Sequence, residues 1–411
     1  MITTDRLLTT RIKKRLLDNM EEQKYGDWSL GVHQRLSGKR IPLGGSIEVT
    51  QRCNNRCVHC YNNLAAGDQG ARKKELTLDE HCRIIDEIAG FGCLWLLLTG
   101  GEIFLRKDFL DIYSYAKQKG FIITLFTNGT LITPDIADYL AKFPPFSIEI
   151  TLYGNTKETY ESIAGVPGSF DRCMKGIRLL TERKLPLKLK TMAIVQNKHE
   201  IFDMKQFVEE ELKLDFKFDA MVNPRRDCSQ RPLEVRLTPR EVVDLDLEDT
   251  DRIAEWKQFA DRFNKPVVDP DKVDKLFQCG GGFQSFAIDS FGRLSLCVLS
   301  GNTYDLREGS FKEGWEKYLL SLRQKKITRQ TKCSNCQIKS MCGMCPANSE
   351  LECREAEAPI DFLCEVAHLR AHILGLNITF HGDCEYCPDG SKHKKLMQTV
   401  AGLAKRHGPV T

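Results

Sequence analysis

Three cysteines lie within eight residues of one another in the segment CNNRCVHC, as Cys53, Cys57 and Cys60. Thiolates are the usual protein ligands of iron–sulfur clusters. Three thiolates on a four-iron cluster leave one iron without a protein ligand, and that iron can bind a small molecule directly. A closed zinc site needs four ligands, and the only nearby candidate at close spacing is His59. The segment favours a four-iron cluster, with a zinc knot as the alternative.

A second, larger group of seven cysteines occupies residues 279–364. Its members are Cys279, Cys297, Cys333, Cys336, Cys342, Cys345 and Cys364. The chain has 17 cysteines in 411 residues and lacks a secretory signal at its start, so we expect metal-binding thiolates in a reducing cytoplasm rather than disulfides. The two CxxC pairs are also compatible with a zinc ribbon, but three of the seven cysteines would then have no role.

Six apolar strands alternate with amphipathic helices over residues 46–225. We place the strands at 46–50, 94–99, 121–127, 146–153, 187–195 and 216–222. This alternation predicts a parallel sheet with helices outside it, and six units predict an open, partial (βα)6 barrel. The chemistry of such an α/β barrel lies at the carboxyl ends of its strands. The first cysteine group directly follows the first strand.

Several polar residues and glycines lie at or near the ends of the later strands. They are Gly100, Gly101 and Glu102 after the second strand, Asn128 after the third, Glu149 and Thr151 on the fourth, and Lys190 on the fifth. Paired glycines allow a close approach of the backbone. Cys228, which follows the sixth strand, is a candidate hydrogen donor or acceptor.

The flanking segments divide the rest of the chain. We expect an N-terminal helical extension over 1–45, one or two exposed bridging helices in 226–278, a metal-organised domain over 279–376 that ends in a helix at 365–376, and a C-terminal tail over 377–411 that is frayed from residue 388. Outside the two cysteine groups, we interpret Cys82, Cys93 and Cys173 as small buried hydrophobes. Cys384 and Cys387 stay unassigned.

The first cysteine group and the strands around it resemble the radical SAM superfamily, whose signature is Cys-x3-Cys-x-aromatic-Cys. Cys53, Cys57, His59 and Cys60 match it, and the resemblance covers roughly residues 45–225. It implies that the open iron chelates S-adenosylmethionine, and that one electron cleaves the sulfonium to methionine and a 5′-deoxyadenosyl radical.

The same resemblance implies a set of residues that bind S-adenosylmethionine. They are His59 near the adenine, Gly100, Gly101 and Glu102 at the methionine amino group, Asn128 in the motif FTNGT, Glu149 and Thr151 near the ribose, and Lys190. For Glu102 it implies that the carboxylate accepts from the ammonium group.

The second cysteine group, together with Gly292, resembles the SPASM extension of radical SAM peptide maturases. It departs from the commoner pattern because two residues, rather than three, separate Cys342 and Cys345. The resemblance implies one auxiliary four-iron cluster on Cys279, Cys297 and Cys345, with an open iron or a further ligand, for which Cys353 is a spare. It implies another on Cys333, Cys336, Cys342 and Cys364, and hence three clusters in the chain.

SPASM enzymes mostly modify peptides or proteins, so the resemblance implies ribosomal peptide maturation such as crosslink formation. Sulfatase-modifying members carry an acidic residue at the position of Val298, so the sequence disfavours sulfatase modification as the function. Too few residues precede the first strand for a leader-binding domain, so we expect a separate leader-recognition protein or none, and an electron donor such as flavodoxin or ferredoxin. Arg225, Arg226 and Arg231 could engage an acidic leader, although a solvated loop is the simpler reading.

Two other functions stay open. Radical SAM enzymes of tetrapyrrole, haem or other cofactor biosynthesis are the first alternative. A non-enzymatic iron–sulfur or zinc protein that transfers electrons or binds a partner is the second, although such a protein needs no TGGE motif. A net charge of +4 is too small to indicate nucleic-acid binding, and no apolar run is long enough to span a membrane.

Overall fold

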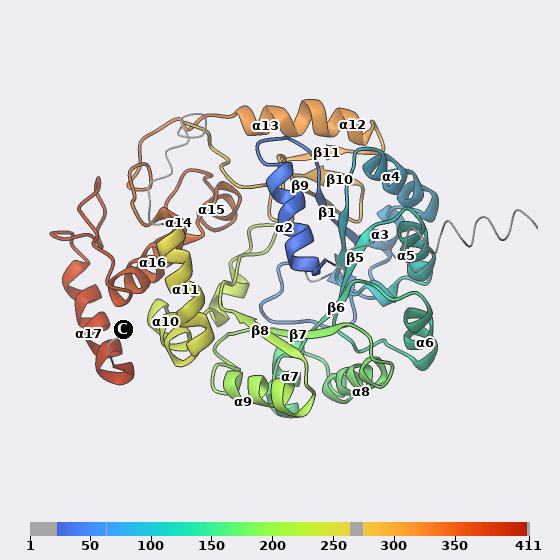
Figure 1. Ribbon diagram of the computed structural model, residues 1–411, viewed down its shortest axis with the longest axis horizontal. Coiled ribbons are helices and arrows are strands. Elements are labelled where there is room, and N and C mark those ends of the chain that lie inside the picture. The colour runs from blue at the N-terminus through green and yellow to red at the C-terminus, as the bar shows by residue number, and fades with distance from the viewer. Residues whose placement is uncertain (1–22, 63, 264–273, 409–411) are drawn as a thin grey trace, which may run out of the picture. The chain divides into compact units, whose positions relative to one another are not determined.

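The computed structural model describes residues 23–62, 64–263 and 274–408 (Figure 1). Residues 1–41 and 42–411 form two separate compact units. In the first unit, helix α2 spans Tyr25–Arg35, within the predicted N-terminal helical extension. The part of that extension in residues 1–22 lies outside the described residues. Everything that follows concerns the second unit.

Six parallel strands form the centre of this unit. They are β1 Gly44–Thr50, β4 Trp95–Gly100, β5 Ile122–Thr127, β6 Ser147–Thr151, β7 Leu187–Met192 and β8 Asp215–Asp219. Each strand pairs in parallel with the next along the chain, and β8 is the last strand at one side of the sheet. The predicted open (βα)6 arrangement is confirmed.

Helices connect these strands and lie along the outside of the curved sheet (Figure 1). They are α4 Leu78–Gly90, α5 Phe109–Gln118, α6 Pro134–Lys142, α7 Lys157–Ala164, α8 Ser169–Glu182 and α9 Ile201–Gln206. Three begin at a threonine (Thr77, Thr133 or Thr156) whose side chain accepts a hydrogen bond from a backbone amide of the first turn. Shorter elements are β2 Arg52–Cys53, β3 Leu64–Ala65, α3 Gln69–Lys74, a 3₁₀ turn at Ile103–Leu105 and a π turn at Phe207–Glu211.

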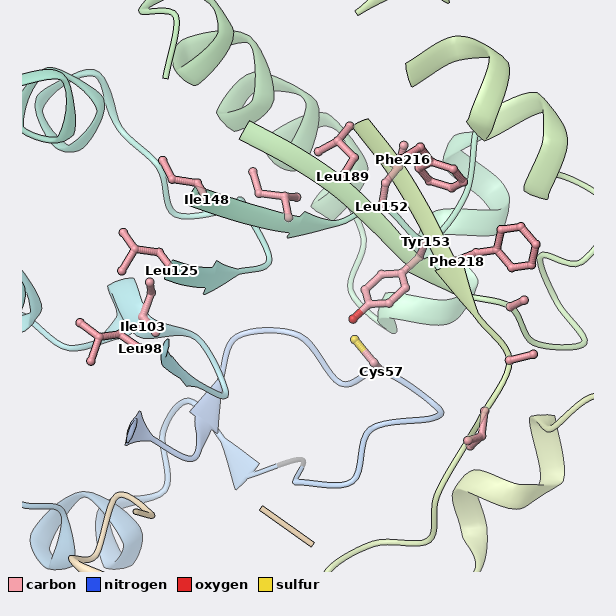
Figure 2. Close-up of a cluster of buried hydrophobic side chains, with 14 of the residues drawn as sticks. Cys57, Leu98, Ile103, Leu125, Ile148, Leu152, Tyr153, Leu189, Phe216 and Phe218 are labelled. Atoms are coloured by element: carbon pink, nitrogen blue, oxygen red, sulfur yellow. The ribbon is translucent and has the colours of Figure 1, made fainter. Parts of the chain in front are cut away.

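The two faces of the sheet differ in polarity because side chains alternate along a strand. On β5, Ile123 and Leu125 are buried, whereas Thr124 and Phe126 are only half-buried. Figure 2 shows apolar side chains of several strands gathered in the core. The opposite, inner face carries polar side chains, among them Glu48, Thr99, Thr124, Glu149, Thr151 and Lys190. The inner face is therefore the one that can hold a polar ligand.

Three further strands extend this sheet beyond β1. They are β9 Ser285–Ile288, which is parallel to β1, then β10 Arg293–Ser295 and β11 Thr303–Asp305, which are antiparallel. The barrel and the start of the cysteine-rich region therefore share one sheet of nine strands.

The rest of the carboxyl-terminal region is helical or irregular. Its helices are α10 Pro239–Glu248, α11 Thr250–Phe263, α12 Phe311–Glu313, α13 Leu320–Gln324, α14 Lys339–Cys342, α15 Pro346–Cys353, α16 Asp361–Ile373 and α17 His393–His407, with a 3₁₀ turn at Arg231–Val235 and a π turn at Gly314–Leu319. In Figure 1, α10, α11, α16 and α17 group together on one side of the barrel.

The prediction of exposed bridging helices is wrong for α10. Val242, Val243 and Asp246 on this helix are buried. The carboxylate of Asp246 accepts from Arg370 of α16 at 2.7 Å and from Arg252 of α11 at 2.6 Å. Asp246 therefore belongs to a group of ion pairs in the interior rather than to a solvated face.

The prediction of a frayed tail is also wrong. Residues 393–407 form the 15-residue helix α17, in which Leu396 and Leu403 are buried and Val400 packs against the core. These three residues have the spacing of one helical face, which packs on α16 and α10. The basic residues and Gly402 in this segment suggested an irregular tail, although the apolar residues have helical spacing.

Among the three cysteines that we interpreted as small buried hydrophobes, Cys93 and Cys173 are buried, whereas Cys82 is half-buried. In the described residues, no helix is both long and apolar enough to cross a membrane.

Candidate functional site

The loop that follows β1, residues 53–62, contains the first cysteine group and is called the cluster loop below. Its entrance is held by Arg52, which donates to the two carboxylate oxygens of Glu75 at 2.8 and 3.0 Å. Its middle is held by the amide of Arg56, which donates to the carbonyl of Ala164 at 2.8 Å. Regular elements of the barrel therefore position this loop.

Each of the three sulfurs in the loop receives a hydrogen bond. Backbone amides two residues along the chain donate to Cys53 and Cys60, both at 3.4 Å. The hydroxyl of Tyr153 donates to Cys57, and Figure 2 shows it directed towards that sulfur. Burial raises the pKa of Cys53 to about 12, and it raises the pKa values of the other two thiols as well. A metal is therefore needed to make them thiolates at neutral pH.

Four buried polar atoms of the cluster loop have no hydrogen-bond partner among the described residues. They are Nδ2 and Oδ1 of Asn55, Nδ1 of His59 and Nδ2 of Asn62. A buried polar atom left unpaired costs about 1–3 kcal/mol, so four in one short loop indicate that a polar group completes it. The ring of His59 packs edge-on against Tyr153, with 5.2 Å between ring centroids.

Gly100 and Gly101 bring the end of β4 against the start of the cluster loop. A Cβ atom at Gly100 would lie 2.0 Å from the carbonyl oxygen of Thr50, and one at Gly101 would lie 2.2 Å from that of Arg52. Gly100 also has a φ of +141°, which other residues rarely adopt. The close approach that we expected of these glycines is thus made to the protein's own backbone.

Glu102 is fully buried and already has protein partners. Its carboxylate accepts from the hydroxyl of Thr127 at 2.7 Å and from the amides of Asn128 and Phe104 at 2.7 and 3.1 Å. Burial raises the pKa of this carboxyl, and the three donors oppose that rise. Glu102 therefore holds the turn after β5, and its expected contact with an ammonium stays a prediction.

That turn places Asn128 against the cluster loop. Its side-chain Nδ2 donates to Cys53 Sγ at 3.6 Å and to Asn54 Oδ1 at 2.9 Å, and its Oδ1 accepts from the amide of Thr130 at 2.9 Å. Asn128 thus contacts a cysteine ligand candidate directly. Glu102, Asn128 and Cys53 form one connected network from β4 to the loop.

Glu149, Thr151 and Lys190 come together on the inner face. Lys190 Nζ lies 3.0 Å from the Glu149 carboxylate and 2.8 Å from the centroid of the Phe126 ring, and Thr151 is in register with Lys190. Burial lowers the pKa of Lys190 to about 8, although the charge of Glu149 opposes that shift. This lysine can hold or release a proton near neutral pH.

Glu48 on β1 is a buried residue of the inner face that the sequence analysis missed. Arg226 donates to both of its carboxylate oxygens at 2.7 Å, and the hydroxyl of Tyr61 donates at 3.2 Å. Burial raises the pKa of Glu48, against the effect of Arg226. The sequence feature that could have indicated Glu48 is its position between the apolar residues Ile47 and Val49 in the first strand. Arg226 is therefore not the free rim cation that we considered.

Cys228 packs towards the carboxyl-terminal region. Its sulfur lies 4.0 Å from the carbonyl oxygen of Glu350 in α15, and its backbone carbonyl accepts from Arg354 at 3.1 Å. These contacts fix the loop after β8 on α15, and they give no support to a role as hydrogen donor or acceptor.

The expected first auxiliary set, Cys279, Cys297 and Cys345, lies beside the barrel. Burial raises the pKa of Cys297, and the neighbouring thiols of Cys345 and Cys279 raise it further. A cavity of about 410 Å³ is lined by Cys297 and Val298 and by the amino-terminal halves of β1, β4 and β5. The cavity therefore places Cys297 next to the amino-terminal ends of these strands, the end of the barrel opposite to the cluster loop.

The expected second auxiliary set, Cys333, Cys336, Cys342 and Cys364, lines one cavity. A hydrogen bond that the Cys364 thiol donates to Cys342, followed by burial, raises the pKa of Cys364, and burial raises that of Cys336 to about 12. The spare Cys353 is exposed at the end of α15. Cys384 lines the same cavity as the four, which the sequence analysis did not anticipate.

Residues 47–208 match the family described as the radical SAM superfamily. This stretch of the chain is therefore a radical SAM domain. As a radical SAM enzyme the protein uses S-adenosylmethionine and a four-iron cluster, and the buried thiols and unpaired polar atoms of the cluster loop fit such a group.

Two curated relatives and one solved structure show what the chain is similar to. It is 28% identical over 322 residues to the AdoMet-dependent heme synthase of Methanosarcina barkeri, which covers 74% of this chain and 90% of that protein. It is 31% identical over 173 residues to the PqqA peptide cyclase of Ruegeria pomeroyi, which covers 42% of this chain and 45% of that protein. SuiB of Streptococcus suis bound to S-adenosylmethionine has the same fold, with a TM-score of 0.62 and 16% identity over 87% of this chain and 88% of SuiB.

Proposed function

We propose that this enzyme cleaves S-adenosylmethionine at a cluster held by Cys53, Cys57 and Cys60 and uses the reaction to modify a peptide or protein. The cluster loop carries the first half of the proposal, because three buried sulfurs each accept a hydrogen bond beside four unpaired polar atoms. When bound, the cluster and S-adenosylmethionine supply a one-electron reductive cleavage of the sulfonium.

The chain's own residues bind and orient the cofactor in this proposal. His59 and Asn55 offer unpaired polar atoms to it, and Asn128 steadies Cys53. Glu149 and Thr151 lie on the inner face of β6 and would contact the ribose. Lys190 holds a proton next to Glu149 and can exchange it, because its pKa is about 8.

Two auxiliary four-iron clusters are part of the proposal and bring the total to three. Cys279, Cys297 and Cys345 would hold one, and the set of Cys333, Cys336, Cys342 and Cys364 would hold the other. A flavodoxin or ferredoxin would supply the electron that starts each turnover. These thiols also favour a reducing compartment.

The peptide substrate is supported by the likeness to the PqqA peptide cyclase, of which the chain spans less than half. The fold is also shared with SuiB bound to its precursor peptide SuiA, at a TM-score of 0.63 and 16% identity over 88% of this chain and 87% of SuiB. A separate leader-recognition protein would bring the peptide to the enzyme.

The test is an anaerobic reaction of the reconstituted full chain with S-adenosylmethionine, a reductant and synthetic precursor peptides encoded next to its gene. We expect 5′-deoxyadenosine together with a peptide that has lost two hydrogens per crosslink, measured by mass spectrometry. Formation of 5′-deoxyadenosine without any change in the peptides would leave the radical chemistry standing and remove the peptide assignment.

A tetrapyrrole substrate is the second candidate, because the chain covers 90% of the Methanosarcina heme synthase. The same reaction mixture with iron-containing porphyrins in place of peptides tests it. A change in the mass of the porphyrin, with no reaction of the peptides, would favour this candidate over the first.

A further inference from the structure

Four buried side chains that can bind metal meet near the carboxyl end of the chain, apart from the three cysteine sets above. His368 lies in α16, and His381, Cys384 and Cys387 lie in the segment between α16 and α17. One ligand atom from each lies within 4.8 Å of the other three. The sequence analysis left the two cysteines unassigned because their partners were not recognised.

The separations suit ligands around a single ion. Nε2 of His368 lies 3.5 Å from Cys384 Sγ and 3.7 Å from Cys387 Sγ, and Nε2 of His381 lies 3.8 Å from Cys387 Sγ. Nδ1 of His381 faces the carbonyl oxygen of Thr379 at 3.2 Å. In a tetrahedral zinc site with bonds of about 2.3 Å to sulfur and 2.0–2.1 Å to nitrogen, these ligand atoms stand about 3.6 Å apart. The observed distances lie around that value.

The histidine in α16 is already oriented for metal binding. Nδ1 of His368 lies 2.7 Å from the carbonyl oxygen of Cys364. A carbonyl only accepts, so Nδ1 carries the proton and Nε2 presents its lone pair to the two sulfurs. A backbone carbonyl behind the ring is a common way to fix a metal-binding histidine.

We propose that His368, His381, Cys384 and Cys387 bind one structural zinc ion. Two thiolates and two imidazoles complete a tetrahedral zinc site and leave no position open for substrate. A four-iron cluster suits this group less well, because each iron takes its own ligand and the ligands then stand farther apart than around one ion. Both cysteines are free thiols rather than a disulfide.

The position of the site indicates what the zinc does. The ion joins α16 to the segment 374–392, which contains no helix or strand and leads into α17. His368 follows Cys364 by one helical turn. His368, His381 and Cys384 also line the cavity of the second auxiliary set. The zinc therefore fixes one wall of that cavity and positions Cys364 within it.

The metal content of the full chain, purified anaerobically without chelators, tests the proposal. We expect about one zinc ion per chain in addition to iron, and a zinc-edge X-ray absorption spectrum with two sulfurs at about 2.3 Å and two nitrogens at about 2.0–2.1 Å. His381→Ala and Cys387→Ala should each lose the zinc and keep the iron of the cluster loop and its formation of 5′-deoxyadenosine.

His372→Ala is the matched control, because His372 lies on the same helix one turn further along and outside the group of four. It should keep its zinc. Wild-type protein with less than a tenth of an equivalent of zinc, or a zinc shell without both sulfur and nitrogen, overturns the proposal. So does a Cys387→Ala protein that loses iron instead. If the variants fail to fold, the X-ray absorption spectrum of the wild-type protein still tests the zinc site. A protein that holds zinc but does not cleave S-adenosylmethionine would contradict the proposed function and not the zinc site.

Discussion

The cluster loop and the cysteine-rich region solve the same problem, the placement of thiols, in different ways. In the barrel, Arg52, Glu75 and the end of α7 hold the loop, so its cysteines are placed by hydrogen bonds and strands that need no metal. In the carboxyl-terminal region, Cys333 and Cys336 lie in turns, and residues 374–392 have no regular structure. If these side chains bind metal as we propose, metal binding and folding are coupled in this region.

The comparison teaches that the fold positions the metal in one region, whereas we expect the metal to complete the fold in the other. Loss of a ligand should therefore have opposite consequences in the two regions. In the barrel it should remove chemistry and spare stability. In the cysteine-rich region it should cost stability and spare the first chemical step.

The largest effect is expected from Cys57→Ala. Loss of this ligand should remove about four irons and abolish formation of 5′-deoxyadenosine, while the circular dichroism and melting of the barrel change little. Iron analysis and mass spectrometry of the reaction products measure both. Cys173→Ala, at a buried cysteine of α8 outside the loop, should keep its iron and activity. An unfolded Cys57→Ala barrel would break the comparison.

Cys345→Ala tests the expectation for the cysteine-rich region. Because cleavage of the sulfonium needs only the first cluster, this variant should still form 5′-deoxyadenosine but lose the modified product and some stability. Product analysis and thermal melting of the same preparation give the readout, with Cys82→Ala, at a half-buried cysteine outside both cysteine groups, as the control. Full product turnover would make the auxiliary set a scaffold. Loss of 5′-deoxyadenosine in a folded variant would mean that electrons enter through it.

A smaller effect is expected from Glu102→Ala. The change leaves the hydroxyl of Thr127 and the amides of Asn128 and Phe104 without their acceptor, and each hydrogen bond to a charged group contributes about 1.5–3 kcal/mol. We expect at least about tenfold weaker binding of S-adenosylmethionine, with cluster iron retained. Isothermal titration under nitrogen measures the affinity. Glu102→Gln keeps one acceptor oxygen, so its affinity for S-adenosylmethionine should lie between those of the wild type and Glu102→Ala. Unchanged affinity in Glu102→Ala would show that Glu102 does not contribute to binding of S-adenosylmethionine.

The smallest effect is a pH dependence of stability that arises from Lys190. Its pKa is lowered from 10.5 to about 8 by burial, so between these values the unfolded chain keeps a proton that the folded chain has lost. The free energy of unfolding should therefore rise with pH through this window, by up to about 3 kcal/mol. Lys190→Met should remove that rise in urea titrations at pH 7.5 and 10. An identical rise in the variant would assign it to other groups.

Local patterns in the sequence determined much of this protein. The eight-residue spacing of Cys53, Cys57 and Cys60 and the alternation of strand and helix depend on neighbours along the chain, so they could be read without coordinates. The six strands were placed within a few residues of their observed limits, and a parallel sheet with its ligand site past the first strand followed. The same kind of pattern was present in α17, but its charged residues obscured it.

Only the tertiary structure decided which distant residues meet. Arg226 lies 178 positions from the Glu48 that it pairs with, and Glu102 finds its donors 25 and 26 residues away. His368 meets Cys384 and Cys387 because the chain after α16 folds back on that helix. A carboxylate or an imidazole carries the same chemistry in any segment, so its role is set by the partners that folding brings within hydrogen-bonding or metal-binding distance.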